Sequence, residues 1–301
     1  MSQPRMKQAG IKQRGFSHLS RIALLALVML LHANVAASSE LATPESTAPE
    51  SITPESITPE SAGPASEASL TPEQQALLAE QQQLEQLAGS VVELSGLTGL
   101  GLQARHLAQQ TLNQHKAALG YQYQVAGRVA ALWSPQQLSE RLKQPLANAE
   151  LAELQQLLAL LTDNRMQQAR EKENSAVADQ DSQAFLGYVQ KLRAQPPGAA
   201  RLQVITELDQ AMRFSELLVH TRASVYGQLQ AVLKDWQPPE NWQANLRNEV
   251  QEFLLYTYRR TPNDGIRTLT QLYQQPVLQQ WLSAVQQNLA AFDQQAATQG
   301  S

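Results

Sequence analysis

The sequence predicts an all-α protein, a multi-helix bundle of about eight or nine helices. Three observations support this prediction. From residue 70 onward apolar residues recur three or four positions apart, and no stretch alternates apolar and polar residues as a strand would. Helix-start signals, in which a hydroxyl residue precedes proline, recur along the chain. Only 5% of the residues are aromatic, while Gln, Leu and Ala abound, which favours helix over strand.

The N-terminal segment, residues 1–37, has the pattern of a secretory signal peptide. It carries five basic residues and no acid, and an unbroken apolar run extends over 22–31. Val35-Ala36-Ala37 then provides the small residues that a signal peptidase reads. Cleavage after Ala37 predicts a periplasmic protein, whereas retention would leave an inner-membrane anchor. The segment favours cleavage, because about sixteen helical residues reach only ~24 Å of a ~30 Å hydrocarbon core.

Residues 38–69 are expected to form a disordered linker rich in Pro, Glu, Ser and Thr. Thr-Pro-Glu-Ser and close variants recur every five residues, at 43–46, 48–51, 53–56 and 58–61. Regular proline removes backbone donors, and the segment has too little apolar surface to offset the entropy of ordering. At about 3.1 Å per residue the linker would reach ~100 Å. The segment is therefore a spacer, a glycosylated stalk, or a solvated tail with no task of its own.

The predicted helical domain spans residues 70–295 and is followed by a disordered tail at 296–301. Its first helix begins with Thr71 as the N-cap, Pro72 at the first helical position and Gln74 completing a capping box. One apolar stripe then repeats every seven residues, at Leu77, Leu84 and Val91.

The later helices follow from the same periodicity and from their end signals. They are predicted over 102–119, with the helical pattern continuing over 121–133, and then from 134, over 148–173, over 182–194, over 202–236, over 242–260, from 263 and from 276. Gly120 is expected to end the first of these. Pro196-Pro197-Gly198 is a hard stop, which makes 195–200 a candidate sub-boundary within the domain.

One internal similarity appears when the chain is shifted by 115 residues. The shift places Leu151 on Ile266, and the apolar stripe that follows Leu151 on the stripe that follows Ile266. Two helical hairpins of common descent would produce this pattern. Two unrelated amphipathic helices would also produce it, since both carry a stripe of period 3.6.

Charge and cysteine content limit the classes of partner. Loss of residues 1–37 would leave 18 Lys+Arg against 27 Asp+Glu, and from residue 70 onward the two are nearly balanced. A domain without net positive charge is not expected to bind nucleic acid, because phosphate neutralisation supplies most of that affinity. The chain has no Cys, so neither a disulfide nor a lipoprotein anchor can form.

No cofactor or metal site is predicted. The glycines of 96–101 lack the preceding strand and the Lys-Ser/Thr sequel of a phosphate loop, and are interpreted as a connection between helices. His106 and His115 are nine residues apart and therefore lie on opposite faces of a helix, and His220 is distant in sequence. The acidic pairs Glu171/Glu173 and Asp179/Asp181 are interpreted as solvated charge.

Glu93 is the single candidate for a catalytic carboxylate. All-helical muramidases that act on the cell wall use one glutamate in a Glu-Ser pair, followed downstream by Gly-Leu-Met-Gln. Here Leu94 follows Glu93, and the nearest later match, at 101–103, is far too close. Because the motif does not match, an enzyme of this kind is only the alternative to a binding protein.

Most of the large aromatic side chains gather in the last quarter of the chain. At helical spacing such residues are first of all expected in the core. A partly exposed subset, with an arginine at its rim, would form a pocket for a ligand or partner. The candidate ligand-binding residues are Tyr256, Tyr258, Arg259, Tyr273 and Trp281.

The last predicted hairpin carries a motif formed by Pro262, Asn263, Asp264, Leu269, Leu272, Tyr273, Pro276, Val277, Leu278, Trp281 and Leu282. It resembles the C-terminal hairpin of uncharacterised bacterial exported all-helical proteins, a domain-of-unknown-function family. In that family a capped helix ends in an aromatic residue, and a Ser-Pro-x-Gly step leads to a second helix. Here Val277-Leu278 follows the proline without the glycine. The resemblance covers about forty residues and implies an envelope location and an all-α fold, but no activity and no site residues.

The sequence therefore predicts a non-enzymatic exported envelope protein, in which a helical binding or scaffold domain follows an acidic linker. Its partner would be an unknown envelope protein or peptide, with a membrane tether only if the signal segment is retained. Two alternatives remain open. One is a cell-wall-acting enzyme with Glu93 as its acid, and the other is a small-molecule or lipid carrier that uses the C-terminal aromatic hairpin.

Overall fold

The computed structural model describes residues 71–298, with the side chains of the last helix described up to Ala291. The expected signal peptide and linker lie outside these described residues. Within 71–298 the chain is all-α, as predicted, and contains more helices than the eight or nine expected. The helices are α1 (Pro72–Ser95), α2 (Gly99–Gln114), α3 (Leu119–Trp133), α4 (Pro135–Lys143), η1 (Gln144–Leu146), α5 (Leu151–Leu161), α6 (Asn164–Ala178), α7 (Gln183–Ala194), α8 (Ala199–Met212), α9 (Phe214–Val232), α10 (Trp242–Thr257), α11 (Asn263–Tyr273) and α12 (Pro276–Thr298).

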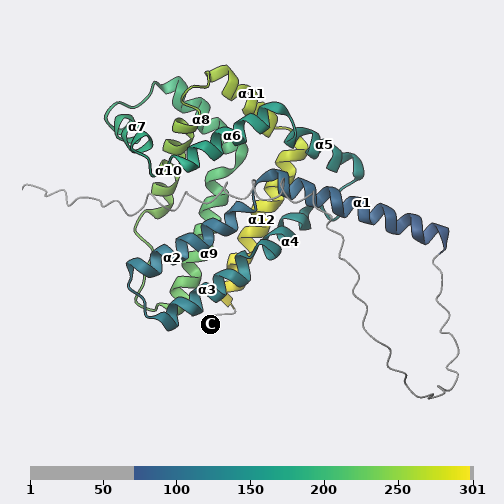
Figure 1. Cartoon of the computed structure of the whole chain (residues 1–301), viewed down its shortest axis with the longest axis horizontal. Helices are drawn as coiled ribbons and strands as arrows, with labels where there is room; N and C mark the ends of the chain where they lie inside the picture. The colour runs from purple at the N-terminus through teal and green to yellow at the C-terminus, as the bar shows by residue number, and fades with distance from the viewer. Residues whose placement is uncertain (1–70, 299–301) are drawn as a thin grey trace, which may run out of the picture.

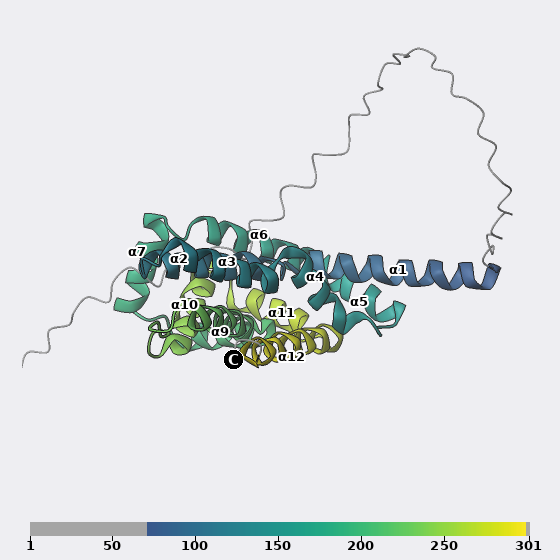
Figure 2. The same cartoon turned by 90° about the horizontal axis from the view of Figure 1, so that it is seen from below.

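The helices form two packed layers. Figure 1 shows the body face on, and Figure 2 shows it from the side, with α1, α2, α3 and α6 in one layer and α9, α10, α11 and α12 in the other. One hydrophobic core runs between them, from Ala88 in α1 to Leu289 in α12. The core includes residues from both sides of 195–200, the candidate sub-boundary within the domain. The last helix continues past residue 295, the predicted end of the domain, to Thr298.

The longest predicted helix, 202–236, is broken in the structure, so that prediction was wrong. Arg213 adopts the left-handed conformation with φ 53° and ends α8, and α9 starts at the next residue. The carboxylate of Asp209 fixes the break, because it accepts hydrogen bonds from the backbone N–H of Ser215 (2.9 Å) and from its hydroxyl (2.7 Å). Apolar periodicity continues across the break and therefore conceals it.

The predicted helix over 148–173 is likewise two helices, α5 and α6. Thr162 closes α5, and Asp163 caps α6 by accepting a hydrogen bond from the backbone N–H of Arg165 at 2.8 Å. The guanidinium of Arg165 donates to the same carboxylate, and together these hydrogen bonds lower the pKa of Asp163 to about 2. Asp is a favoured N-cap residue, so the signal was present in the sequence.

The α2–α3 corner differs from the expectation by one turn. Lys116, with φ 51°, turns the chain after α2, and the N–H of Ala117 donates back to the carbonyl of Leu112 at 3.1 Å. Gly120, expected to end the helix, instead lies in the first turn of α3. Gly101 is needed at the start of α2 for close packing, because a Cβ there would lie 2.6 Å from the carbonyl oxygen of Trp133.

Two helical hairpins, α5–α6 and α11–α12, pack against each other reciprocally. In each, an eleven-residue helix is followed by a two-residue connection and a second helix. Helix α5 contacts α12, and α6 contacts α11. The helix boundaries coincide at an offset of 112 residues, one turn away from the offset of 115 that the sequence suggested, because an apolar stripe nearly repeats after one helical turn.

Helix α1 begins as predicted, with the capping box of Thr71 and Gln74. Its first turns are exposed and project from the body in both views, whereas Ala88, Val91 and Val92 near its C-terminal end are buried (Figures 1 and 2). None of the described helices combines the length and apolar character required to cross a bilayer.

Candidate functional site

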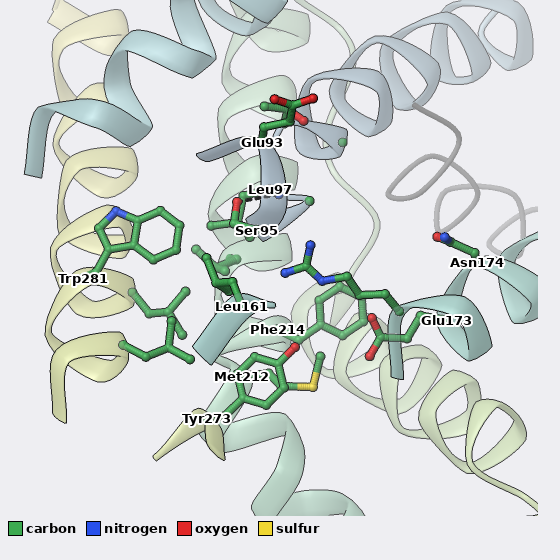
Figure 3. A pocket seen from close by; sticks show the side chains of 17 residues that line it. Glu93, Ser95, Leu97, Leu161, Glu173, Asn174, Met212, Phe214, Tyr273 and Trp281 are labelled. Carbon is green, nitrogen blue, oxygen red and sulfur yellow. Dashed lines mark hydrogen bonds between the residues drawn. The ribbon is translucent and has the colours of Figure 1, made fainter. Parts of the chain in front are cut away.

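A cavity of about 120 Å³ lies where the ends of several helices meet (Figure 3). Its walls come from the α1–α2 connection, the end of α5, the middle of α6, the α8–α9 junction, the end of α11 and the first turns of α12. Most of the lining is apolar and consists of Leu97, Leu161, Met212, Phe214, Leu217, Leu278, Trp281 and Leu282. The two reciprocal hairpins thus contribute to the same cavity.

Several helices end at this point. Gly96 ends α1 in the left-handed conformation (φ 71°), and Arg213 does the same for α8. On the far side the N–H of Gln274 donates to the carbonyl of Thr270 and closes α11. Helices that end around a common point leave space between their last turns, and the side chains here fill it only in part.

Arg170 and Glu173 form the charged part of the lining. They are three residues apart on α6, so they occupy the same face of the helix. Arg170 is buried, with only 9% of its surface exposed, and its positive charge acts on the neighbouring carboxyl group of Glu173. An arginine held in this way is an available donor for an anionic group.

The carboxyl group of Glu173 accepts a hydrogen bond from the hydroxyl of Tyr258 at 2.6 Å. Burial raises the pKa of Glu173, while the Tyr258 hydrogen bond and the charge of Arg170 act in the opposite direction. Burial, reinforced by the charge of Glu173, also raises the pKa of Tyr258 well above its ordinary value. This tyrosine therefore remains a neutral hydrogen-bond donor that fixes the carboxyl group.

Two further polar side chains line the cavity, Tyr273 and Asn174. Burial and the nearby charge of Glu173 raise the pKa of Tyr273, so its hydroxyl is a neutral donor. In Figure 3 this hydroxyl and the Glu173 carboxyl point toward the same space, with Trp281 on the opposite wall. The Oδ1 atom of Asn174 is buried and accepts no hydrogen bond from any residue that the structure describes, so it is an acceptor without a donor.

The structure divides the five candidate ligand-binding residues into two groups. Tyr273 and Trp281 line the cavity, and the indole N–H of Trp281 donates to the carbonyl of Leu142 at 3.2 Å. Tyr256 and Tyr258 are each 1% exposed, and Tyr258 reaches the cavity only through Glu173. The guanidinium carbon of Arg259 lies 3.8 Å from the ring centre of Tyr256, outside the cavity lining.

Tyr256 belongs to a separate aromatic cluster with Phe185 and Tyr188, whose ring centres lie 4.8 Å and 5.4 Å from its own. Its hydroxyl donates to the carboxylate of Asp179 at 2.8 Å. The cluster fixes α7 against α10, which is a packing role.

The interpretation of Glu173 and Asp179 as solvated charge was wrong. Each accepts a hydrogen bond from a buried tyrosine of the α10 end, Glu173 from Tyr258 and Asp179 from Tyr256. The sequence did carry a signal for Glu173: it continues the buried stripe of α6, seven residues after Met166 and four after Ala169.

Glu93 borders the cavity, but its side chain is exposed and lies apart from Glu173 and Tyr273 in Figure 3. His106 and His115 are exposed, and burial lowers the pKa of His220. Within residues 71–298 no group of three or more His, Asp and Glu side chains is placed to hold a metal ion.

No family model, no curated protein and no solved structure matches this chain. The resemblance of its last hairpin to exported all-helical proteins therefore stays a prediction.

Proposed function

We propose that this protein is an exported binding protein of the cell envelope whose central cavity takes a small amphipathic ligand. The ligand is a free small molecule or the terminus of an envelope peptide. The observation that carries the proposal is the cavity itself, in which apolar walls enclose a few convergent polar groups, a combination typical of ligand sites. The N-terminal pattern of residues 1–37 supports the envelope location.

The size of the cavity limits the ligand. An engineered protein cavity of about 150 Å³ lined by apolar side chains binds benzene. A cavity of about 120 Å³ therefore takes a ring-sized or short branched apolar group, with the rest of the ligand extending outward.

The polar lining specifies the head of the ligand. The guanidinium of Arg170 is a donor for a carboxylate, and the hydroxyl of Tyr273 is a second donor. Oδ1 of Asn174 requires a donor from the ligand. A compact apolar group that carries a carboxylate, with an N–H or O–H beside it, satisfies all three side chains.

Thermal unfolding in the presence of toluene, phenylacetate, benzylamine or phenylalanine tests this proposal, because a ligand that binds the folded state raises the midpoint. We expect phenylacetate and phenylalanine to raise it more than toluene or benzylamine. Arg170→Met should remove the advantage of the carboxylates, whereas Arg165→Met, an exposed position on the same helix, should preserve it.

Leu282→Phe places a larger side chain in the cavity and should abolish the effect of every probe. Leu289→Phe, at a buried position on α12 outside the lining, is the matched control and should retain it. Binding that survives Leu282→Phe, or a parent protein that responds to none of the probes, would refute the proposal.

One observation favours a second candidate, the cell-wall-acting enzyme with Glu93 as its acid: Glu93 borders the same cavity. Release of muropeptides by the parent protein, and its loss in Glu93→Gln, would support this alternative. Equal release by both would count against it.

A further inference from the structure

Away from the cavity, α3 presents an exposed apolar surface. Tyr123 is 76% exposed, Leu119 69% and Tyr121 49%, and these are three of the five most exposed large apolar side chains among the described residues. The other two, Leu77 and Leu78, lie on the projecting part of α1. Leu119 and Tyr123 are one helical turn apart and share one face of α3, whereas Tyr121 lies on another side of the helix.

The apolar surface continues along the helix. At 100° per residue, Leu119, Tyr123, Ala126 and Ala130 fall within about 60° of one another. Together with Gly127 and Ala131 they form the outer face of α3, and all six residues are exposed. The inner side of the helix is buried through Val125, Val129 and Trp133. Apart from Gln122, Gln124 and Arg128, helix α3 therefore carries apolar or small residues on both its inner and its outer side, which is the pattern of a helix that is covered on both sides.

The segment that carries the outer face has charged side chains of one sign. Residues 94–139, which contain all of α2 and α3, include no Asp or Glu, although the whole chain carries a net charge of −4. The bases in this segment, Arg105, Lys116 and Arg128, are all exposed. An exposed apolar face in a segment that has basic but no acidic side chains is complementary to an anionic surface that has an apolar interior.

We propose that the outer face of α3 docks onto an anionic lipid membrane, with the helix lying in the plane of the interface. Leu119 and Tyr123 enter the boundary between headgroups and acyl chains, where tyrosine is enriched in membrane proteins. The three bases contact lipid phosphates. The small residues Ala126, Gly127 and Ala130 allow the helix axis to approach the headgroups closely.

A second copy of the chain is a poorer occupant of this face. Symmetric pairing through α3 would bring the positive charges of the two copies together, because the segment holds no acid to compensate them. Lipid phosphates provide the missing negative charge.

The absence of native cysteine allows a local test. A polarity-sensitive fluorophore is attached to Gln124→Cys on α3 and, as the matched control, to Gln210→Cys on α8, both exposed glutamines. Vesicles of phosphatidylcholine mixed with phosphatidylglycerol should shift the emission of the α3 label to the blue and leave the α8 label unchanged. High salt and pure phosphatidylcholine should weaken the shift. This readout is local to α3, so it holds whether or not residues 1–37 are retained.

Variants separate docking through the outer face from other causes. In the Gln124→Cys background, Leu119→Ser with Tyr123→Ser should lower the vesicle affinity about tenfold or more. Lys116→Gln with Arg128→Gln should remove the preference for anionic lipid. Leu77→Ser with Leu78→Ser, on the projecting part of α1, should leave the affinity unchanged.

Vesicle affinity that does not respond to Leu119→Ser with Tyr123→Ser would overturn the proposal. A shift of the α3 label that depends on protein concentration in the absence of vesicles would also overturn it. Sedimentation of a dimer under those conditions would then assign the outer face to a second copy of the chain.

Discussion

Substitution of Gly101 by alanine tests how closely α2 packs against the end of α3. An added Cβ would lie 2.6 Å from the carbonyl oxygen of Trp133 and 3.4 Å from Cδ2 of Leu138. The first distance is far below van der Waals contact, and its partner is backbone, which cannot rotate away. Overpacking of this kind costs about 1–3 kcal/mol.

Gly127→Ala is the matched control. Gly127 lies within α3 with nothing within 4 Å of an added Cβ, so alanine there should stabilise the helix by about 0.5–1 kcal/mol. Since both substitutions place alanine in a helix, the difference between the two variants isolates the clash to within a few tenths of a kcal/mol. We expect Gly101→Ala to be less stable than Gly127→Ala by about 1–3 kcal/mol.

Urea unfolding followed by far-UV circular dichroism measures this difference directly. In thermal unfolding it corresponds to roughly 2–12 °C for a domain of this size. Equal midpoints for the two variants would show that α2 does not approach the end of α3 as described, and a gain in stability for Gly101→Ala would refute the packing argument altogether.

Three further predictions concern the groups around Glu173 and α10. Tyr258→Phe removes the donor to the carboxyl of Glu173 and should lower the free energy of unfolding by about 1.5–3 kcal/mol. Urea unfolding measures this loss, and an unchanged midpoint would contradict the hydrogen bond. Arg201→Met removes the donors to the carbonyls of Tyr258 (2.6 Å) and Thr261 (2.9 Å) and should cost at least about 2 kcal/mol, with Arg193→Met at an exposed position as the control. Because burial raises the pKa of Glu173, ionisation of this residue opposes folding, so its contribution to stability falls as the pH rises from its ordinary pKa of 4.5 to the raised value. Glu173→Gln keeps the acceptor for Tyr258, and the stability of this variant relative to the parent should increase over that pH range; a difference independent of pH would refute the assignment.

The sequence was sufficient for the fold class and for most helix starts. Thr71, Ser134 and Ser182 accept hydrogen bonds from backbone N–H groups of the helices that they precede, because capping is a local interaction of adjacent residues. The breaks at Lys116 and Arg213 were missed, since both are left-handed residues other than glycine, and their conformations depend on contacts made elsewhere in the fold.

The candidate site was predicted only in part for a related reason. Tyr273 and Trp281 could be suggested from their own hairpin, but the charged wall of the cavity comes from α6, about a hundred residues earlier. Neither Arg170 nor Glu173 stands out in a charged run, and only the packing of α6 against α11 brings them opposite Tyr273. The stripe of Met166 and Ala169 indicates that Glu173 faces the core, but the residues that lie opposite it depend on tertiary contacts that a single sequence does not show.

Helix α1 gives the molecule a mechanical property. Its 24 residues make a stiff rod about 36 Å long, whose far end stands clear of the body and whose near end, at Ser95 and Gly96, is part of the cavity wall. A force applied at Thr71 would therefore act, through one continuous helix, on residues that line the cavity.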